Sequence, residues 1–459
     1  MRITVIGSGY VGLVAAAGFA SVGHRVTCVD LDARKVAAIN AGQPLLHEDG
    51  LVDLVQAGRA SGALRATTTL EEGADADAIF ICVETPSTPG GGIDLTSVRA
   101  CAREVGEVLR RRREYCVVAV KSTAVPGTAE DVVAPAIWKE SGRTSADIGI
   151  ASNPEFLREG QAVHDFLHPD RIVIGGIDQR SIDAIAAAYD PFAAPVFRTT
   201  PRTAEVIKYA SNALWATLVS FANEIATICE RTPGVDVEDV LRAVHEDERL
   251  TAPGGSPVGA ASYLRAGCGF GGSCLPKDVR ALVRYARDAG ANPELLSAVL
   301  HINEARPRAL VQLIERAAGT LKQRTFAVLG LAFKPGTDDL RESSAIHVVA
   351  GLLDGGARVQ AYDPVAQTTA RAFWKDPRVA VCTTVAEALT GADAAVVVTA
   401  WPEFRTLNWT DLRSRMARPV IVDGRRLLDG ATLENAGYQY FCLGRQPLVT
   451  PQPDSAPTL

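Results

Sequence analysis

The eleven residues RITVIGSGYVG, at positions 2–12, are the most informative about the fold. They begin with a short β-branched apolar run that ends in glycine, which is typical of a buried strand. The glycines that follow have the spacing GxGxxG, and an alanine-rich helical pattern begins among them. A second apolar run, HRVTCVD at residues 24–30, comes after that helix. The order strand, glycine turn, helix, strand predicts the first unit of a parallel, doubly wound α/β fold.

The same stretch predicts a dinucleotide site. Gly7, Gly9 and Gly12 would permit a tight turn and let a pyrophosphate approach the N-terminus of the helix. Asp30 ends the second strand, where a carboxylate accepts hydrogen bonds from ribose hydroxyls and repels a 2′-phosphate. The pattern therefore favours NAD over NADP. FAD is the other contender, although no second flavin signature is present, and a glycine turn that binds nothing is the alternative.

Apolar runs alternate with helical or loop segments up to about residue 199, and this alternation argues for a parallel sheet covered by helices. From Pro201 the pattern is helical, and α/β alternation returns at residues 325–336. We predict an α/β fold in which two Rossmann-like, doubly wound parallel-sheet domains are joined by a helical middle domain. The predicted segments are an NAD-binding domain at 1–199, a helical linker and dimerisation domain at 200–318, a C-terminal α/β domain at 319–445 and a disordered tail at 446–459.

Composition narrows the classes of protein. A chain of 459 residues with 47% hydrophobic and 22% charged residues indicates a globular protein of two or three domains. A net charge of −6 argues against a general nucleic-acid binder. No apolar run is long enough for a membrane span, and the N-terminal residues lack the parts of a signal peptide. Nine scattered cysteines without a CxxC pair favour reduced thiols in the cytoplasm over a zinc site or a disulfide framework.

One cysteine lies in an unusual setting, the sequence GCGFGGSCLPKD at residues 267–278. Cys274 precedes a helical pattern, so the positive end of that helix would favour its thiolate. Lys277 would add to this effect, and Asp278 would lie one turn into the helix, close enough to act as a base or to orient water. The glycines would let a substrate lie against backbone amides. The alternative is a buried structural cysteine in a glycine-rich loop.

Other polar residues are candidates for the same chemistry. Lys208 and Asn212 are four residues apart on one face of a helical pattern, and two such donors suit an oxyanion. A solvated helix edge explains their spacing equally well. Glu155, Glu159 and Thr123 follow predicted strands, where parallel sheets deliver residues to a ligand cleft. Ordinary loop capping is the alternative for these three.

Together the motifs resemble the nucleotide-sugar 6-dehydrogenase family, from residue 1 to about 445. In chain order they read GSGYVG, KSTAVPGT, SNPEFLREG, KYASNA, GFGGSCLPKD, AFKPGTDDLRESS and DGRR. The resemblance implies an enzyme that oxidises the C6 alcohol of a sugar to a carboxylate with two NAD per turnover and no metal. It also implies a homo-oligomer, a dimer or larger, and no nucleic-acid or membrane partner.

The resemblance assigns the covalent step to Cys274, which would attack the aldehyde to form a thiohemiacetal and then carry a thioester. Lys208 and Asn212 would stabilise the C6 oxyanion. Asp278 would take part in proton transfer and water orientation. The residues implied for thioester hydrolysis are Glu155 as base and Thr123 holding a water.

Further binding residues follow from the same resemblance. Those implied for NAD are Gly7, Gly9, Tyr10, Val11, Gly12, Asp30, Lys35, Thr85, Thr123, Glu159, Lys277 and Arg341. Those implied for the nucleotide sugar are Phe156, Leu157, Arg158, Glu159, Lys208, Asn212, Arg249, Tyr263, Arg265, Phe270, Gly271, Phe333, Lys334 and Arg425. Lys334 and Arg425 lie in the C-terminal α/β domain, which would bind UDP, and Arg249 would reach the substrate of a neighbouring subunit.

The motifs DGRR and AFKPGTDD favour UDP-glucose as the substrate. GDP-mannose and a UDP-N-acetyl-aminosugar are the alternatives within the family. A non-catalytic NAD-binding regulator and a two-electron hydroxyacid dehydrogenase are the alternatives outside it. Three features depart from the family pattern: Glu84, where a small residue is usual beside the cofactor, the shifted Val and Pro in KSTAVPGT, and a longer Gly/Pro-rich segment at 251–262.

Overall fold

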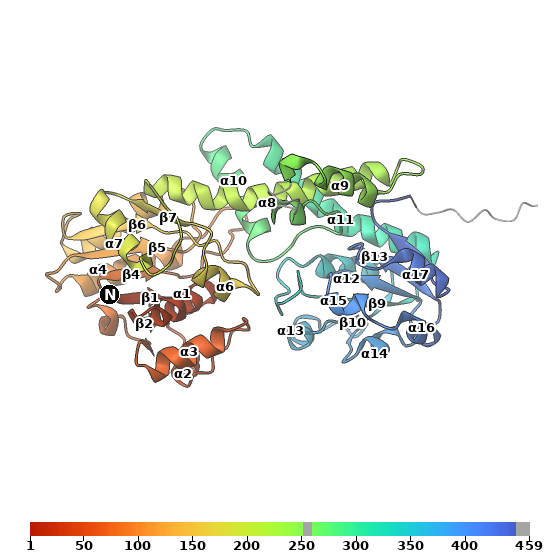
Figure 1. The fold of residues 1–459 in the computed structure, drawn as a ribbon, viewed down its shortest axis with the longest axis horizontal. Coiled ribbons are helices and arrows are strands. Elements are labelled where there is room, and N and C mark those ends of the chain that lie inside the picture. Colours follow the sequence, from red (N-terminus) through yellow and green to blue (C-terminus); the bar gives the residue numbers. More distant parts are fainter. Residues whose placement is uncertain (251–258, 447–459) are drawn as a thin grey trace, which may run out of the picture. The chain divides into compact units, whose positions relative to one another are not determined.

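The computed structural model describes residues 1–250 and 259–446, which divide into two compact units (Figure 1). The first unit comprises Met1–Asn212 and Arg280–Asn292, and the second comprises the remaining described residues. The division therefore passes through the predicted helical middle. Residues 447–459 of the predicted tail and 251–258 of the Gly/Pro-rich segment lie outside the described residues.

The first unit is built on an eight-stranded sheet with the strand order β3-β2-β1-β4-β5-β6-β7-β8. Its strands are β1 (Arg2–Ile6), β2 (Arg25–Val29), β3 (Leu64–Thr67), β4 (Ala78–Ile81), β5 (Cys116–Val120), β6 (Ile148–Ser152), β7 (Ile172–Gly176) and β8 (Val196–Thr199). All neighbours pair in parallel except β6 and β7, which pair antiparallel. The predicted parallel sheet is confirmed for the order β3 to β6, and β7 with β8 forms an edge of opposite direction.

Helices follow most of these strands. They are α1 (Tyr10–Ser21), α2 (Ala33–Asn40), α3 (Leu51–Ala60), η1 (Leu70–Gly73), α4 (Thr96–Leu109), the π-helix η2 (Thr128–Val133), α5 (Ala134–Ser141), α6 (Ala162–Leu167) and α7 (Gln179–Tyr189). Alternate residues of β4 belong to different cores: Phe80 packs in one cluster with α1, and Ile79 packs in another with α4. Because both faces of the sheet are covered, its central strands β4 and β5 are apolar and buried at every position.

The second unit carries a six-stranded, fully parallel sheet with the order β11-β10-β9-β12-β13-β14. Its strands are β9 (Thr325–Leu329), β10 (Arg358–Tyr362), β11 (Val379–Val381), β12 (Ala394–Val397), β13 (Val420–Asp423) and β14 (Gln439–Cys442). The helices around it are α12 (Ser344–Asp354), α13 (Gln367–Phe373), α14 (Val385–Leu389), α15 (Pro402–Arg405), α16 (Trp409–Leu412), η5 (Arg413–Arg415) and α17 (Gly430–Asn435). The second predicted α/β region is thus confirmed.

The segment between the two sheets is helical, as predicted. It contains α8 (Pro201–Cys229), α9 (Val237–His245), η3 (Glu248–Leu250), η4 (Gly259–Tyr263), α10 (Leu275–Asp288) and α11 (Glu294–Ala318). Among the described residues, no helix combines the length and the apolar character that crossing a bilayer requires.

Candidate active site

The glycine turn after β1 is tightly built. A Cβ at Gly12 would lie 1.8 Å from the carbonyl oxygen of Gly7, so α1 can start this close to the turn only with glycine there. A Cβ at Gly9 would meet nothing within 4 Å. Gly9 is the N-cap of α1 and has no side-chain capping bond. The N-terminus of α1 therefore presents open space beside backbone N–H groups, which suits a pyrophosphate.

Asp30 lies next to this turn, where β2 ends. Its Oδ2 accepts hydrogen bonds from the backbone N of Ser8 at 2.7 Å and from the Ser8 hydroxyl at 2.5 Å, and Lys35 Nζ lies 3.7 Å away. Burial alone would raise the pKa of Asp30, but the Ser8 donors, the Asp32 backbone N–H and Lys35 hold it below its ordinary value. An ionised carboxylate beside an open glycine turn fits the ribose and pyrophosphate of a dinucleotide.

Other residues predicted for NAD surround the same strand ends of the first unit. Thr85 and Thr123 follow β4 and β5, and the Thr85 hydroxyl donates to the Thr123 carbonyl at 2.8 Å. The Tyr10 hydroxyl accepts from the backbone N of Gly160 at 2.7 Å, beside Glu159. Val11 and Glu159 are half-buried, and Glu84 is exposed. The predicted NAD residues Lys277 and Arg341 belong to the second unit.

Glu155 and Lys208 form a buried ion pair. Lys208 Nζ lies 2.8 Å from Glu155 Oε1, and the two side chains are 4% and 6% exposed. Burial raises the pKa of Glu155, but Lys208 and the backbone N–H of Leu157 outweigh this and lower it. Lys208 also lies 5.5 Å from the centre of the Phe156 ring, and Asn212 follows one turn later in α8, half-buried. Two separately predicted candidates thus meet.

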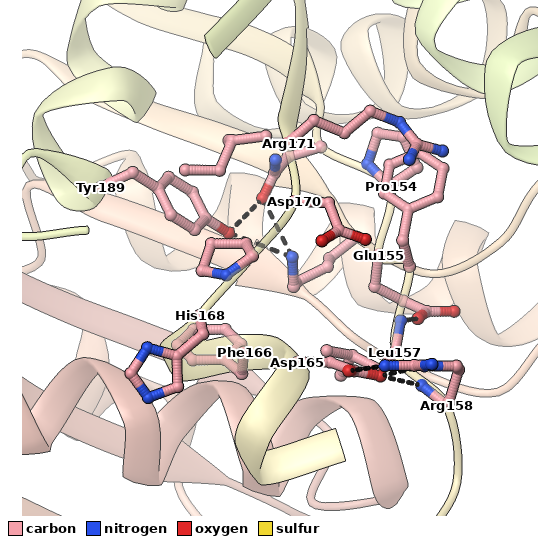
Figure 2. A pocket seen from close by; sticks show the side chains of 15 residues that line it. Pro154, Glu155, Leu157, Arg158, Asp165, Phe166, His168, Asp170, Arg171 and Tyr189 are labelled. Atoms are coloured by element: carbon pink, nitrogen blue, oxygen red, sulfur yellow. Dashed lines mark hydrogen bonds and ion pairs between the residues drawn. The ribbon is translucent and has the colours of Figure 1, made fainter. Parts of the chain in front are cut away.

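A small cavity of about 70 Å³ opens beside Glu155 (Figure 2). Its wall includes Lys121, which donates to Asn153 Oδ1 at 3.1 Å and to the Tyr189 hydroxyl at 3.0 Å. Sequence reasoning missed this buried network, although Lys121 and Asn153 lie in the two motifs that supplied Thr123 and Glu155. The volume is enough for a few water molecules and too small for a nucleotide.

Figure 2 also shows Arg158 and Asp165 facing each other. Arg158 Nη2 lies 2.6 Å from Asp165 Oδ1, and Nε lies 3.0 Å from Oδ2. This two-point pairing fixes the direction of an exposed guanidinium at the rim of the cavity, while Leu157 is half-buried next to it.

Cys274 directly precedes α10 in the second unit. All nine cysteines belong to the described residues and none forms a disulfide, and Cys274 alone is exposed. Burial raises the pKa of other thiols, for example that of Cys82 to about 12. Asp278 donates its backbone N–H to the Cys274 carbonyl at 2.8 Å, and its buried carboxylate pairs with Lys277 Nζ at 2.6 Å. The structure thus places an exposed thiol directly before a helix, where the helix N-terminus favours a thiolate.

The glycines of the thiol loop permit a close contact with the C-terminal sheet's first loop. A Cβ at Gly271 would lie 2.1 Å from the carbonyl oxygen of Glu342. The backbone N of Gly272 donates to the Arg341 carbonyl at 2.9 Å, and Phe333 packs against Gly272. The motifs GFGGSC and AFKPGTDDLRESS are therefore adjacent within the second unit.

The remaining residues predicted for the nucleotide sugar differ in setting. Arg425 Nη1 donates to the Gly269 carbonyl at 2.8 Å, and the backbone N of Phe270 donates to Asn303 Oδ1 at 2.7 Å. Elsewhere in the unit, the Tyr263 ring stacks on that of Trp215, and the half-buried Lys334 lies 5.7 Å from the centre of the Phe333 ring. Two arginines form ion pairs with nearby aspartates, Arg341 with Asp339 and the exposed Arg249 with Asp247. Arg265 is exposed.

Comparison with family models covers most of the chain. Residues 1–193 match the NAD binding domain of the UDP-glucose/GDP-mannose dehydrogenase family, residues 202–305 match its central domain, and residues 327–430 match its UDP binding domain.

Individual relatives cover nearly the full length. The UDP-glucose 6-dehydrogenase of Haloferax volcanii is 43% identical over 434 residues, which are 93% of this chain and 97% of that protein. A solved UDP-glucose dehydrogenase from Pyrobaculum islandicum has a TM-score of 0.87 and 40% identity, covering 96% of this chain and 97% of the other. A UDP-D-ManNAc dehydrogenase from Pyrococcus horikoshii has a TM-score of 0.84 and 28% identity, covering 98% and 100%. The chain therefore belongs to the UDP-glucose/GDP-mannose dehydrogenase family, and it is an NAD-dependent oxidoreductase.

Proposed function

We propose that the protein oxidises UDP-glucose to UDP-glucuronate in a four-electron reaction that passes through a thioester on Cys274. The observation that carries the proposal is the single exposed cysteine directly before α10, near the ion pair between the half-buried Lys277 and the buried Asp278. A thiol nucleophile divides a difficult oxidation into easier steps. The likeness to the UDP-glucose dehydrogenases of Haloferax volcanii and Pyrobaculum islandicum supports this choice of substrate.

The first unit would bind NAD and assist the first oxidation. NAD, when bound, accepts a hydride in each of the two oxidations. The turn at Gly7, Gly9 and Gly12 would hold its pyrophosphate, and Asp30 would hold a ribose. Lys208 and Asn212 would donate hydrogen bonds to the C6 oxygen as it loses its proton and becomes negative.

Cys274 would supply the covalent step. The Cys274 thiolate attacks the C6 aldehyde, a C–S bond forms, and the carbonyl oxygen takes a proton to give a thiohemiacetal. Loss of that proton and of a hydride from C6 leaves a thioester. Water held by Thr123 then adds to C6 while Glu155 accepts its proton, the C–S bond breaks, and the carboxylate and the thiol are released. Asp278 would orient water and carry protons near the sulfur.

NADH counting with Cys274→Ser tests the mechanism. Wild type is expected to form two NADH per UDP-glucose, whereas Cys274→Ser is expected to form no acid and to retain NAD binding. The control is Cys382→Ala, which removes a buried thiol of the same unit and keeps turnover. Unchanged acid formation by Cys274→Ser would refute the covalent role, and one NADH per sugar would refute the four-electron reaction.

A second candidate is the same chemistry on another nucleotide sugar. The likeness to the UDP-D-ManNAc dehydrogenase from Pyrococcus horikoshii favours a UDP-N-acetyl-aminosugar among these, and the family also includes GDP-mannose in its name. A panel of the three substrates decides: turnover of one alternative without turnover of UDP-glucose would overturn the proposed substrate. NAD binding without turnover of any would favour a non-catalytic regulator.

We also propose that the chain is a homo-oligomer. Leu214, Phe221 and Ile228 lie seven residues apart on α8 and are 52%, 46% and 56% exposed. We call these three residues the α8 stripe. A heptad-spaced apolar stripe is self-complementary in a two-fold pair of helices. Light scattering of wild type and Phe221→Lys tests this: a monomeric wild type would exclude it. Nine cysteines that form no disulfide favour a cytoplasmic location.

A further inference from the structure

We propose that Glu205 is a positioning residue that fixes the Thr123 loop, residues 123–127, for thioester hydrolysis. The inference rests on the proposed function, in which Thr123 holds the attacking water. Glu205 itself would touch neither substrate nor cofactor. It is a buried carboxylate of the first unit that the mechanism above does not use.

Glu205 binds the end of the loop through two backbone groups. Its Oε2 accepts from the backbone N of Gly127 at 2.6 Å, and its Oε1 accepts from the backbone N of Ala129 at 2.9 Å. These two N–H groups belong to the turn that starts the π-helix η2. A carboxylate that accepts two backbone N–H bonds fixes both the position and the direction of this turn.

The beginning of the loop is held separately. The Thr85 hydroxyl donates to the Thr123 carbonyl, and the Val125 carbonyl accepts from the backbone N of Thr128 at 3.1 Å and from its hydroxyl at 2.6 Å. The loop is therefore short, internally bonded and anchored at both ends. With Thr85 at one end, the anchor at the other end is Glu205.

Keeping the Glu205 carboxylate ionised at this buried position costs free energy. Glu205 is 3% exposed, and burial raises its pKa to about 7 even though two backbone N–H groups and Arg202 lower it. The negative charge of Glu130 on η2 raises the pKa of Glu205 further. Arg202 also forms an ion pair with Asp131 of η2, with 2.7 Å between Arg202 Nη2 and Asp131 Oδ1. Perturbed buried carboxyls concentrate at functional sites, and the bonds to the loop give this one a physical role.

The position of Glu205 on α8 links the loop to Glu155. Lys208 follows three residues later on the same buried face and forms the ion pair with Glu155. One turn of α8 thus holds two segments that follow different strands of the sheet. The proposed water site and the proposed base would share a single anchoring helix.

Glu205→Gln tests the proposal, and Glu130→Gln is its matched control. Glutamine keeps the shape of Glu205 but turns one acceptor into an NH₂ group that faces a backbone N–H. Glu130 lies on η2, contacts Arg202 and bonds no N–H of the loop. Glu205→Asp keeps the charge on a shorter side chain, and it is expected to fall between wild type and Glu205→Gln.

Hydrogen exchange of the peptide that contains Gly127 and Ala129 gives the first readout. We expect these amides to be protected in wild type and in Glu130→Gln, and to exchange at least about tenfold faster in Glu205→Gln because their acceptor is lost. Equal protection in Glu205→Gln and wild type, or no protection in wild type, would overturn the anchor.

Rapid-mixing kinetics with NAD and UDP-glucose give the second readout. In Glu205→Gln we expect a burst of NADH per active site within about twofold of wild type, a steady rate at least about tenfold lower, and a covalent adduct on Cys274 by intact mass. A merely less stable protein would lower burst and steady rate together, and that result would overturn the proposal. An inactive wild type would refute the proposed function, while the exchange result would still decide whether Glu205 anchors the loop.

Discussion

Asp30 and Asp363 occupy the same place in the two sheets. In the first sheet β1 and β2 are in register at Ile6 and Val29, and Asp30 comes next; in the second sheet β9 and β10 are in register at Leu329 and Tyr362, and Asp363 comes next. Asp30 keeps a side chain that is 12% exposed beside open space. Asp363 is 0% exposed and accepts from four backbone N–H groups and from the Trp401 indole.

The glycine turns that follow β1 and β9 also differ in how open they are. Gly7 and Gly330 both follow the first strand with positive φ, and each donates its N–H to the second strand. Two residues later the first sheet has Gly9, with open space above it, whereas the second has the fully buried Ala332. The comparison shows that the same backbone arrangement has two different uses in the two sheets. The first sheet leaves the turn open for a ligand, and the second uses its carboxylate to close the turn.

Replacing the buried carboxylate gives the largest expected effect. Asp363→Ala removes the acceptor of five donors in a closed site, so it is expected to lower the free energy of unfolding by about 3 kcal/mol or more. Asp30→Ala is expected to cost less than about 1 kcal/mol. Urea unfolding of both variants measures this, and equal losses would break the comparison.

Gly9→Ala examines the open space directly. An added Cβ meets no protein atom within 4 Å, so stability is expected to change by less than about 1 kcal/mol. The Cβ would lie where the pyrophosphate approaches, so the Kd for NAD is expected to rise about 10- to 100-fold. Calorimetric binding of NAD with thermal unfolding tests both parts. Unchanged NAD affinity would mean that the pyrophosphate does not use this turn.

Asp30→Ala has a smaller expected effect on cofactor binding. Loss of the ribose acceptor is expected to raise the KM for NAD about tenfold. Loss of the negative charge is expected to narrow the preference for NAD over NADP, because the 2′-phosphate is no longer repelled. Steady-state kinetics with both cofactors measure the ratio. A preference equal to that of wild type would assign cofactor choice to another residue.

The smallest expected effect is a pair of opposite pH dependences. Burial raises the pKa of Asp423 in the second sheet, whereas Ser8 and the other donors lower that of Asp30 against burial. The stability that wild type gains over Asp423→Asn is therefore full below the unfolded value of 3.8 and is lost as pH rises through the folded pKa. The gain over Asp30→Asn is full above 3.8 and is lost as pH falls. Free energies of unfolding measured across this pH range test both. If the two gains in stability changed in the same direction with pH, the predicted opposite dependences would be wrong.

The features of the structure that the sequence predicted depend on local patterns. The glycine turn after β1, the position of Asp30 after β2, the long helix α8 and the position of Cys274 before α10 each depend on residues that are close in sequence. The opposite direction of β7 was not predictable, because an apolar run such as RIVIGG carries no information about strand direction.

Residues whose setting depends on distant segments were missed. Glu205 is buried because it meets Gly127 and Ala129, which are 78 and 76 residues away in the chain. Lys121 is buried against Tyr189 for the same reason. The spacing of Glu205 and Lys208 on one helix face was a signal that could have been used. In the sequence, the only sign that the turn after β9 is closed is Ala332, which stands where the turn after β1 has its second glycine, Gly9.

The burial of eight thiols has a practical consequence. A bulky alkylating reagent meets one accessible sulfur on each folded polypeptide, that of Cys274. The amount of label taken up by a preparation therefore measures the number of folded molecules whose Cys274 thiol is unmodified. Dividing a reaction rate by that number compares variants that differ in their folded fraction.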